Sequence, residues 1–457
     1  MDINGYIESQ RDKMIADLKT LIRVPSVKGD ALPDMPFGEN VAKALSSALS
    51  MAEDLGFKTY NRENYVGIVE YGAGDETLGI LTHLDVVPEG TGWSVDPYEG
   101  AVVDDAFIGR GASDNKGPTI SALYALAAVK QSDALLNKKV QLLLGCDEES
   151  GWGDIEYYKQ HYILPDMAFS PDGDYPVVNA EKAILHADIK KTFRTKPTDV
   201  LFLRAGNRPN IVAPFGEAVV VCPLESAVSV AEAVAAETGT TITVKKDRDN
   251  VRISVTGKGA HASLPQEGNN AITALLAVLG KLPLTGDAGK MLRALHSAYP
   301  HKDYYGLQSF VDCSDDVSGR LTQNPGLLEL NGKTLLMCSD MRVPVTIDVQ
   351  EVLVRLSATF LPYNVTARHT MAAHYVEEES PLVQKLLAVY SELTGQDAYC
   401  VAVGGGTYAR AVEQAVSFGC KFPGTDLRMH MADERYTIDD LLLNAKLMAH
   451  AIVALCT

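Results

Sequence analysis

Apolar residues recur at two different spacings in the first part of the chain. Apolar residues at helical spacing between residues 14 and 22 predict one helix, and residues 41–55 are predicted to form a second, which ends at Gly56. Proline favours the first turn of a helix, so Pro118 predicts a third one. Residues 66–71, 78–82 and 167–169 are predicted to be strands, and the apolar run at 140–144 is typical of a strand buried on both faces. The alternation predicts an α/β fold with a mixed, mostly parallel sheet flanked by helices.

The pattern changes in the middle of the chain. Longer alternating stretches, such as residues 251–257 and 334–343, lie between helical ones at 270–280 and 348–360, which indicates an α+β lobe. A further helix is predicted to begin at Ser380–Pro381. From there to the last residue the pattern again predicts short strands and helices, including a helix at 441–455 that follows Thr437. We therefore expect an inserted lid domain at 184–376 between two pieces, 1–183 and 377–457, of one catalytic domain.

The composition of the chain limits which partners and which cellular compartment we expect. The chain has 457 residues, 46% of them apolar, and a formal net charge of −18. A surface with this much negative charge repels phosphate backbones and anionic lipids. We therefore expect neither nucleic acid nor membrane as a partner. Seven scattered cysteines without a CxxC pair, and an N-terminus unlike a secretory signal, favour reduced thiols and a cytoplasmic location.

Polar side chains gather where the predicted strands end. They are His83 and Asp85, then Asp114 just before a helix, then Asp147, Glu148 and Glu149, and finally Asp172. Any one of them alone is more commonly a turn residue, a helix cap or a buried histidine. Sites in parallel sheets form beyond the carboxyl ends of the strands, so four such endings in order predict a common site.

Carboxylates crowded at one place repel each other. Two charges ~4 Å apart interact at about 4 kcal/mol in an effective dielectric near 20. The group must therefore take up protons or bind cations. Mixed imidazole and carboxylate ligands suit Zn²⁺, with Mn²⁺ and Co²⁺ as the other candidates.

Several motifs together resemble the dizinc exopeptidase and deacylase family. That family includes aminoacylases, succinyl-diaminopimelate desuccinylase and bacterial dipeptidases, and the resemblance is strongest to the dipeptidases of the PepV type. The motifs are HLDVVP (83–88), GRGASDNKGP (109–118), DEES (147–150), SPDGDYP (170–176), GKGAHAS (257–263), GGGTYAR (404–410) and MHMADE (429–434). They cover nearly the whole chain.

The resemblance implies a set of metal ligands. Asp114 would bridge two zinc ions, one of which would also bind His83 and Asp172, and the other Glu149 and His430. A cis peptide is expected after Asp114. Asn115 stands where the family more commonly has a second aspartate, and a changed charge there could alter metal preference.

The resemblance also implies roles in catalysis and substrate binding. Glu148 matches the general base, Asp85 the carboxylate that holds the His83 ring, and His261 the lid histidine that donates to the oxyanion. Two positions, Asn210 and Arg342, match those that bind the substrate carboxylate in the dipeptidase branch. The glycine turn at Gly405 is expected to open a helix, and its small residues would let backbone N–H groups approach an anion, with a simple tight turn as the alternative.

These roles imply a zinc-dependent dipeptidase that cleaves unblocked dipeptides with a metal-activated water. An N-acyl amino acid deacylase or desuccinylase would use the same metal residues and is the first alternative. A catalytically inactive metal-binding relative is the second. A nucleotide-binding loop at GRGAS is disfavoured, because Asp114 replaces its last glycine. The long inserted lobe favours a monomer.

Overall fold

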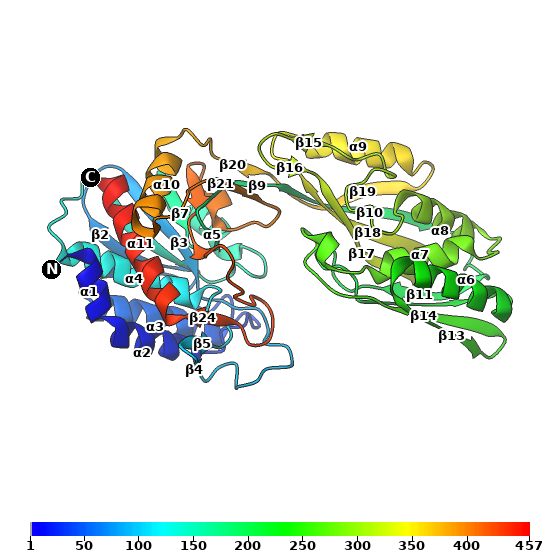
Figure 1. Cartoon of the computed structure of the whole chain (residues 1–457), viewed down its shortest axis with the longest axis horizontal. Coiled ribbons are helices and arrows are strands. Elements are labelled where there is room, and N and C mark those ends of the chain that lie inside the picture. The colour runs from blue at the N-terminus through cyan, green and yellow to red at the C-terminus, as the bar shows by residue number, and fades with distance from the viewer. Residues whose placement is uncertain (1) are drawn as a thin grey trace. The chain divides into compact units, whose positions relative to one another are not determined.

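A computed structural model of the chain describes residues 2–457, which divide into two compact units (Figure 1). The first unit comprises the chain up to Ala180 together with Tyr375–Val401 and Gly406–Thr457. The second comprises Glu181–His374 and the short segment Ala402–Gly405. Each unit has its own hydrophobic core.

The first unit is built on a nine-stranded mixed sheet. Its strands are β1 (Lys58–Arg62), β2 (Val66–Gly72), β3 (Thr77–His83), β6 (Lys139–Gly145), β7 (Met167–Ser170), β9 (Val177–Glu181), β20 (His374–Tyr375), β21 (Cys400–Val403) and β22 (Ala415–Ser417). Their order is β1-β2-β6-β3-β7-β22-β9-β20, with β21 paired to β9. The pairs β6–β3, β3–β7 and β7–β22 are parallel, whereas β1–β2, β2–β6 and β22–β9 are antiparallel. The predicted α/β fold is confirmed, and its parallel part is the centre of the sheet.

Helices cover both faces of this sheet, as Figure 1 shows. One face packs against α1 (Ile3–Ser9), α2 (Arg11–Ile22), α3 (Glu39–Asp54), α4 (Lys116–Gln131), α10 (Pro381–Thr394) and α11 (Ile438–Cys456). The other face packs against α5 (Gly153–His161) and the 3₁₀ turn η2 (Tyr408–Ala411). Side chains along a strand alternate between the two cores, with Leu142 and Leu144 in the first and Leu143 in the second. This explains why β6 reads as a continuous apolar run.

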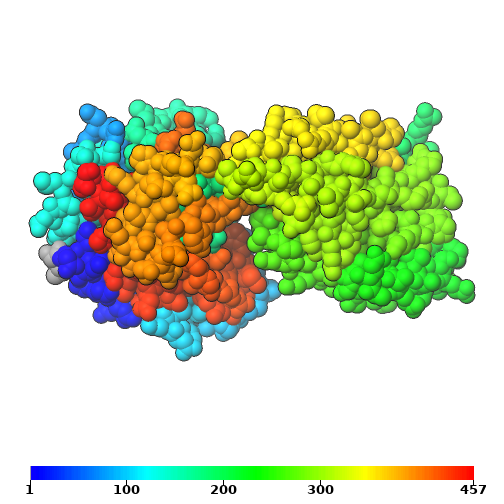
Figure 2. All heavy atoms as spheres, turned by 45° about the horizontal axis from the view of Figure 1, so that its top comes forward, coloured from blue at the N-terminus to red at the C-terminus, as the bar shows by residue number. Residues whose placement is uncertain are grey.

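Predicted helix ends agree with the structure at several places. Ser380 Oγ accepts a hydrogen bond from Val383 N (3.3 Å) and caps α10, and Thr437 Oγ1 accepts one from Asp440 N (2.9 Å) and caps α11. The helix expected after the glycine turn is wrong, because β21 is followed only by the four-residue η2. The first and last helices lie side by side (Figure 2, blue and red), where His450 Nε2 is 3.1 Å from Asn4 Oδ1.

The second unit has an eight-stranded sheet whose neighbouring strands are all antiparallel. Its order is β13 (Thr241–Asp247), β14 (Asn250–Thr256), β12 (Phe215–Val220), β11 (Val200–Ala205), β17 (Thr322–Asn331), β18 (Thr334–Val343), β10 (Ala183–Thr192) and β19 (Asn364–Met371). Its helices are α6 (Leu224–Thr238), α7 (Ala271–Lys281), α8 (Asp287–Ala298), α9 (Val349–Thr359) and the 3₁₀ turn η1 (Pro265–Glu267). This is the α+β character that the alternating stretches predict.

Short strands complete both units. They are β4 (Ala101–Val103), β5 (Ala106–Ile108) and β24 (Arg435–Thr437) in one small sheet, β8 (Gly173–Asp174) with β23 (Cys420–Lys421) in another, and β15 (Ser314–Asp315) with β16 (Gly319–Arg320) in a third. Across residues 2–457, none of the helices has the length and apolar character needed to cross a membrane.

Candidate metal centre

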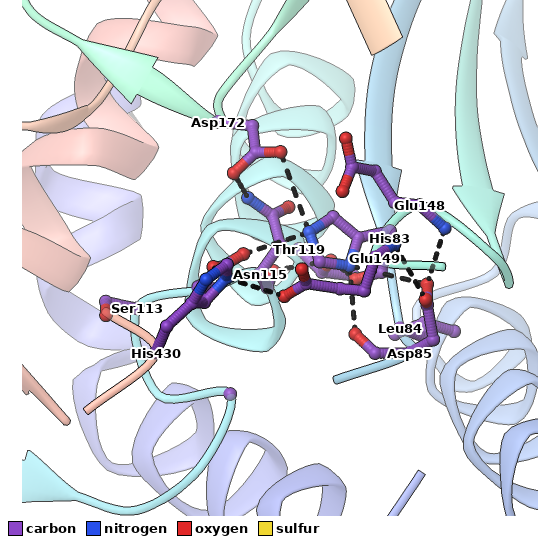
Figure 3. A network of polar contacts seen from close by, with 12 residues as sticks. His83, Leu84, Asp85, Ser113, Asn115, Thr119, Glu148, Glu149, Asp172 and His430 are labelled. Carbon is purple, nitrogen blue, oxygen red and sulfur yellow. Dashed lines mark hydrogen bonds and ion pairs between the residues drawn. The ribbon is translucent and has the colours of Figure 1, made fainter. Parts of the chain in front are cut away.

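Side chains from distant stretches of the first unit meet beyond the carboxyl ends of its central strands (Figure 3). His83 ends β3, Glu148 and Glu149 follow β6, and Asp172 follows β7. A small residue is needed where β6 ends, because a Cβ on Gly145 would lie 2.4 Å from the ring of Tyr408. The edge of the sheet predicted from the strand pattern is therefore the place where these side chains converge.

Two histidines contact this group of carboxylates from opposite sides of Asp114. His83 Nε2 lies 3.0 Å from Asp114 Oδ1 and 3.6 Å from Asp172 Oδ2. His430, from the loop between β23 and β24, places Nε2 2.9 Å from Asp114 Oδ2 and 3.0 Å from Glu149 Oε1. Each oxygen of Asp114 thus faces a different histidine. We call these five residues the metal-site cluster.

The donor atoms of this region lie close enough together to share cations. One oxygen or nitrogen from each of His83, Asp114 and Glu149 falls within 4.8 Å of the others, and the same holds for His83, Glu148 and Asp172. Glu148, for which the sequence predicts the role of general base, therefore also lies within ligand distance. Imidazole and carboxylate donors without a thiolate suit Zn²⁺, Mn²⁺ or Co²⁺.

The ion pairs within the cluster shift the acidity of its members strongly. Burial lowers the pKa of His430, but its contacts with Asp114 and Glu149 outweigh this and raise the pKa to about 11. Burial likewise opposes a charged His83, while the nearby carboxylates of Asp114, Asp172 and Asp85 raise its pKa well above the usual value. Without a metal, His430 is therefore protonated at neutral pH, and the surrounding carboxylates favour the protonated form of His83 as well.

The pKa values of the carboxylates shift in opposite directions. Burial favours a raised pKa for Asp114, but the two histidines lower it below the usual value. Burial and the charge of Asp114 raise the pKa of Glu149 to about 7. Burial, followed by the charges of Asp172 and Glu149, raises the pKa of Glu148 well above its usual value, although His83 opposes this. The cluster thus requires positive charge, which divalent cations at these donors would supply, so the residues present fit a metal centre.

Asp85 acts through a different atom from the predicted one. His83 Nδ1–H donates to the backbone carbonyl of Asp85 (2.9 Å), whereas the nearest carboxylate oxygen is 3.5 Å away. The carboxylate instead accepts hydrogen bonds from the backbone N–H groups of Glu148 and Glu149, both at 3.1 Å. Asp85 therefore orients the His83 ring with its main chain and fixes the two glutamates with its side chain.

Asn115 contacts a predicted ligand directly. The peptide bond between Asp114 and Asn115 is cis, as the resemblance implies. Asn115 Nδ2 donates to Asp172 Oδ1 (3.0 Å) and to the carbonyl of Pro171 (3.0 Å). It therefore occupies one oxygen of Asp172 and leaves Oδ2 directed at His83.

One supporting residue, Asp154 in α5, was not indicated by the sequence pattern. Its Oδ2 accepts hydrogen bonds from the backbone N–H groups of Cys146 (2.6 Å) and Asp147 (3.0 Å) and also contacts the hydroxyl of Tyr408. Burial raises the pKa of Asp154 to about 6. Asp154 thereby fixes the start of the loop that carries the two glutamates. A lone aspartate in the first turn of a helix gives no signal for this role, because it looks like an ordinary helix-end residue.

The predicted substrate-binding residues lie in the second unit. Arg342 is buried, and its Nε and Nη2 donate to the two oxygens of Asp340 (2.7 and 2.8 Å). Its Nη1 donates to the carbonyl of Gly404. The Nε–Nη2 edge of the guanidinium is therefore occupied, and only the N–H groups of Nη1 and Nη2 that these bonds leave over remain to contact a carboxylate.

His261 and Asn210 lie beside each other in the same unit. The backbone N–H of Ala262 donates to the carbonyl of Asn210 (3.0 Å), and Ile211 pairs with His261 as an isolated bridge. The ring of His261 is exposed, with Nδ1 2.6 Å from Ser263 Oγ. A Cβ on Gly404 would lie 2.7 Å from Ser263 Cβ and 3.4 Å from Arg342 Cγ, so these residues share one surface of the second unit. Gly405 follows them and is half-buried.

Known proteins resemble the chain over its whole length. It is 34% identical over 469 residues to the Beta-Ala-Xaa dipeptidase of Lactobacillus delbrueckii subsp. lactis, covering 100% of this chain and 99% of the relative. It is 35% identical over 463 residues to the putative dipeptidase YtjP of Bacillus subtilis, covering 99% and 100%.

Solved structures share the fold. Human carnosine dipeptidase 1 superposes with a TM-score of 0.60 at 13% identity over 99% of this chain and 98% of its own. YXEP of Bacillus subtilis, described as a dinuclear metal binding peptidase from the M20 family, gives 0.52 at 11% identity over 98% and 99%. The model of Peptidase family M20/M25/M40 matches residues 79–454, which include every member of the metal-site cluster. The chain belongs to Peptidase family M20/M25/M40.

Proposed function

We propose that this chain is a metal-dependent dipeptidase that hydrolyses the peptide bond of unblocked dipeptides. The observation that carries the proposal is the metal-site cluster, in a chain that matches relatives named as dipeptidases from end to end. The proposed substrate is a small peptide, and the protein acts as a cytoplasmic monomer, without nucleic acid or membrane partners.

The cluster has the ligands for two cations. His83, Asp114 and Asp172 would hold one, and Asp114, Glu149 and His430 the other, with Zn²⁺ as the first candidate and Mn²⁺ or Co²⁺ as the others. Bound there, two divalent cations would acidify a water and polarise the scissile carbonyl. Asp85 and Asn115 hold the ring of His83 and one oxygen of Asp172 in place.

Glu148 is the proposed general base. Its half-buried carboxylate lies beside His83 and Asp172, and the hydrogen bond from its backbone N–H to Asp85 fixes its main chain. In this role it accepts a proton from the attacking water and delivers it to the leaving amine.

The second unit would supply the contacts to the substrate. His261 is proposed to donate a hydrogen bond to the oxyanion, for which its exposed ring is suited. Arg342, Asn210 and Gly405 are proposed to bind the terminal carboxylate of the dipeptide. Asp340 accepts hydrogen bonds from Nε and Nη2 of Arg342 and the carbonyl of Gly404 accepts one from Nη1, so the proposed contact would use the N–H groups of Nη1 and Nη2 that these bonds leave over.

A substrate panel combined with metal quantification tests the proposal. The purified protein is assayed on dipeptides and on N-acetyl and N-succinyl amino acids, before and after chelation and again after Zn²⁺, Mn²⁺ or Co²⁺ is returned. We expect dipeptide hydrolysis that chelation abolishes and metal restores. Activity confined to the acyl compounds would identify a deacylase instead, and metal binding without turnover on either class would identify an inactive relative.

A further inference from the structure

A buried carboxylate behind the metal-site cluster has no assigned role. Glu434 lies four residues after His430, and its side chain is fully buried. Its Oε1 accepts hydrogen bonds from Ser113 N (2.9 Å), Ser113 Oγ (3.1 Å) and Asp114 N (3.0 Å). Its Oε2 accepts from Gly111 N (3.1 Å) and Arg110 Nη1 (2.6 Å). Both oxygens are thus used by donors of a single loop, residues 110–114.

This contact joins the two segments that carry Asp114 and His430. The residues it connects are 320 positions apart in the chain. The backbone N–H of Gly109 also donates to the carbonyl of Glu434 (3.0 Å), so side chain and main chain of Glu434 hold the same loop. Because Asp114 N itself donates to Oε1, the position of the Asp114 backbone depends on this carboxylate.

A carboxylate is the group that this arrangement requires. Burying an ionised carboxylate is unfavourable unless donors surround it, and here five donors do so, one of them the guanidinium of the buried Arg110. A glutamine amide would turn its NH₂ either toward Ser113 and Asp114 or toward Gly111 and Arg110. In both orientations donors would face donors.

We propose that Glu434 is a positioning residue for metal binding, which sets the 110–114 loop so that the two oxygens of Asp114 face His83 and His430. Glu434 touches neither substrate nor metal, and acts through Asp114. Partners of this kind orient metal ligands, and their loss typically lowers metal affinity about 10–100-fold. This inference rests on the proposed metal-dependent function.

Titrating the chelated full-length protein with Co²⁺ tests the inference, with binding followed by calorimetry and by the visible absorption of the bound ion. We expect two Co²⁺ per wild-type chain. Glu434→Gln should bind Co²⁺ about 10–100-fold more weakly and with a changed absorption spectrum. Glu434→Asp keeps the charge and should recover part of the affinity.

The neighbouring Asp433 provides a matched control. Its carboxylate accepts hydrogen bonds from Ser94 N (2.7 Å) and Ser94 Oγ (2.9 Å), and no hydrogen bond joins it to the 110–114 loop within residues 2–457. Asp433→Asn removes a negative charge three residues after His430, next to Glu434 in the chain, so we expect its Co²⁺ affinity to stay within about twofold of wild type.

The outcomes separate this inference from the proposed function. A wild-type protein that binds no Co²⁺ would refute the metal-dependent function itself. A folded Glu434→Gln variant with wild-type Co²⁺ affinity and spectrum, or an equal loss in Asp433→Asn, would overturn the positioning role. If Glu434→Gln does not fold, Ser113→Ala decides, because it removes only the Ser113 hydroxyl contact. It should show a severalfold loss of affinity, and an unchanged affinity would overturn the inference.

Discussion

Two buried groups of charged side chains, one in each unit, neutralise their carboxylates in different ways. In the second unit, Asp340 is bound by Arg342 through two hydrogen bonds (2.7 and 2.8 Å) and by His186 Nε2 at 2.9 Å. Burial would raise the pKa of Asp340, but the charge of Arg342 and the hydrogen bonds lower it. In the metal-site cluster of the first unit, each ion pair that we find among residues 2–457 joins a carboxylate to an imidazole.

The two groups differ in whether the side chain that carries the positive charge can lose its proton. A guanidinium stays protonated at every accessible pH, so Asp340 and Arg342 form a permanent pair. An imidazole can release its proton and offer the same nitrogen to a metal. Buried carboxylates beside arginine are therefore structural, whereas buried carboxylates beside histidine can exchange protons for cations.

Replacing Glu148 has the largest expected effect on turnover. Glu148→Ala should lower the rate of dipeptide hydrolysis by about 10²–10⁴-fold, because the proton-transfer group is lost. Metal content, measured by mass spectrometry of the dialysed protein, should remain at two ions per chain. Glu156→Gln, on the exposed face of α5, is the control for lost charge. Since Glu148 also lies within ligand distance of His83 and Asp172, a loss of metal would identify it as a ligand instead of the base.

Removing one cation from each group tests the comparison itself. In chelated protein, Arg342→Met leaves the buried Asp340 with His186 in place of its permanent cation and should lower the free energy of unfolding by about 3–5 kcal/mol. His430→Ala should cost within about 1 kcal/mol, because the side chain is 52% exposed and Asp114 and Glu149 can take up protons. Denaturant unfolding measures both. The double variant Arg342→Met with Asp340→Leu should recover most of the loss, and equal costs for the two single variants would contradict the distinction.

His261 tests whether the chemistry at the metal-site cluster needs a donor from the second unit. His261→Ala should lower the rate by about 10²–10³-fold if it removes the oxyanion donor. Its Co²⁺ affinity and stoichiometry should equal those of wild type, since His261 belongs to neither candidate ligand group. Turnover close to the wild-type rate would show that the oxyanion donor lies elsewhere.

Part of the metal-site cluster could be predicted from the strand pattern, because His83, Glu149 and Asp172 follow a local rule, whereas His430 and the ligand roles were implied by the family resemblance. Each buried strand of the central sheet is a short apolar run, and the polar residue that ends it, such as His83 after β3, lies at the carboxyl edge. Helix caps were accessible for the same reason, since Ser380 and Thr437 bond to residues three positions away. Patterns of this kind need no knowledge of the tertiary fold.

The contacts that hold the cluster in place could not be predicted. Glu434 and Asp154 bind backbone N–H groups, which every residue offers, so no residue type in the sequence marks the partner. The carbonyl of Asp85 likewise bonds to His83 only because of the local turn. The contact between Asp340 and Arg342 could have been predicted from the sequence, because alternate residues of a strand share one face.

Metal binding should release protons from the metal-site cluster. The pKa of His430 is raised to about 11, so this imidazole is protonated in metal-free protein at pH 7, and the carboxylates around His83 raise its pKa and favour its protonated form. Each must lose its proton to bind a metal, which means that the affinity falls as the pH is lowered. We expect about two protons per chain, plus a fraction from Glu149, in calorimetric titrations with Co²⁺ in buffers of different ionisation enthalpy. Binding without proton release would show that the cations occupy other donors.

Of the variants considered, Asn115→Asp should change metal binding least. It also tests how many protons the metal-site cluster releases when it binds cations. The substitution replaces the amide that donates to Asp172 Oδ1 by a second carboxylate. Two carboxylate oxygens ~3 Å apart repel each other at about 5 kcal/mol in an effective dielectric near 20, so the metal-free variant should hold one more proton between them. Co²⁺ binding should then release about three protons instead of two.

The affinity at neutral pH should change by less than about tenfold, because the added negative charge attracts the cations while the additional proton must be displaced. Asn115→Ala separates the two contributions, since it removes the amide donor without adding a charge and should leave the proton count at about two. An unchanged count in Asn115→Asp would mean that the carboxylates of the metal-site cluster tolerate a further charge without a proton. In that case, crowding of negative charge would not explain why the metal-site cluster binds exchangeable cations. Another cause would then have to explain its difference from the Asp340–Arg342 pair.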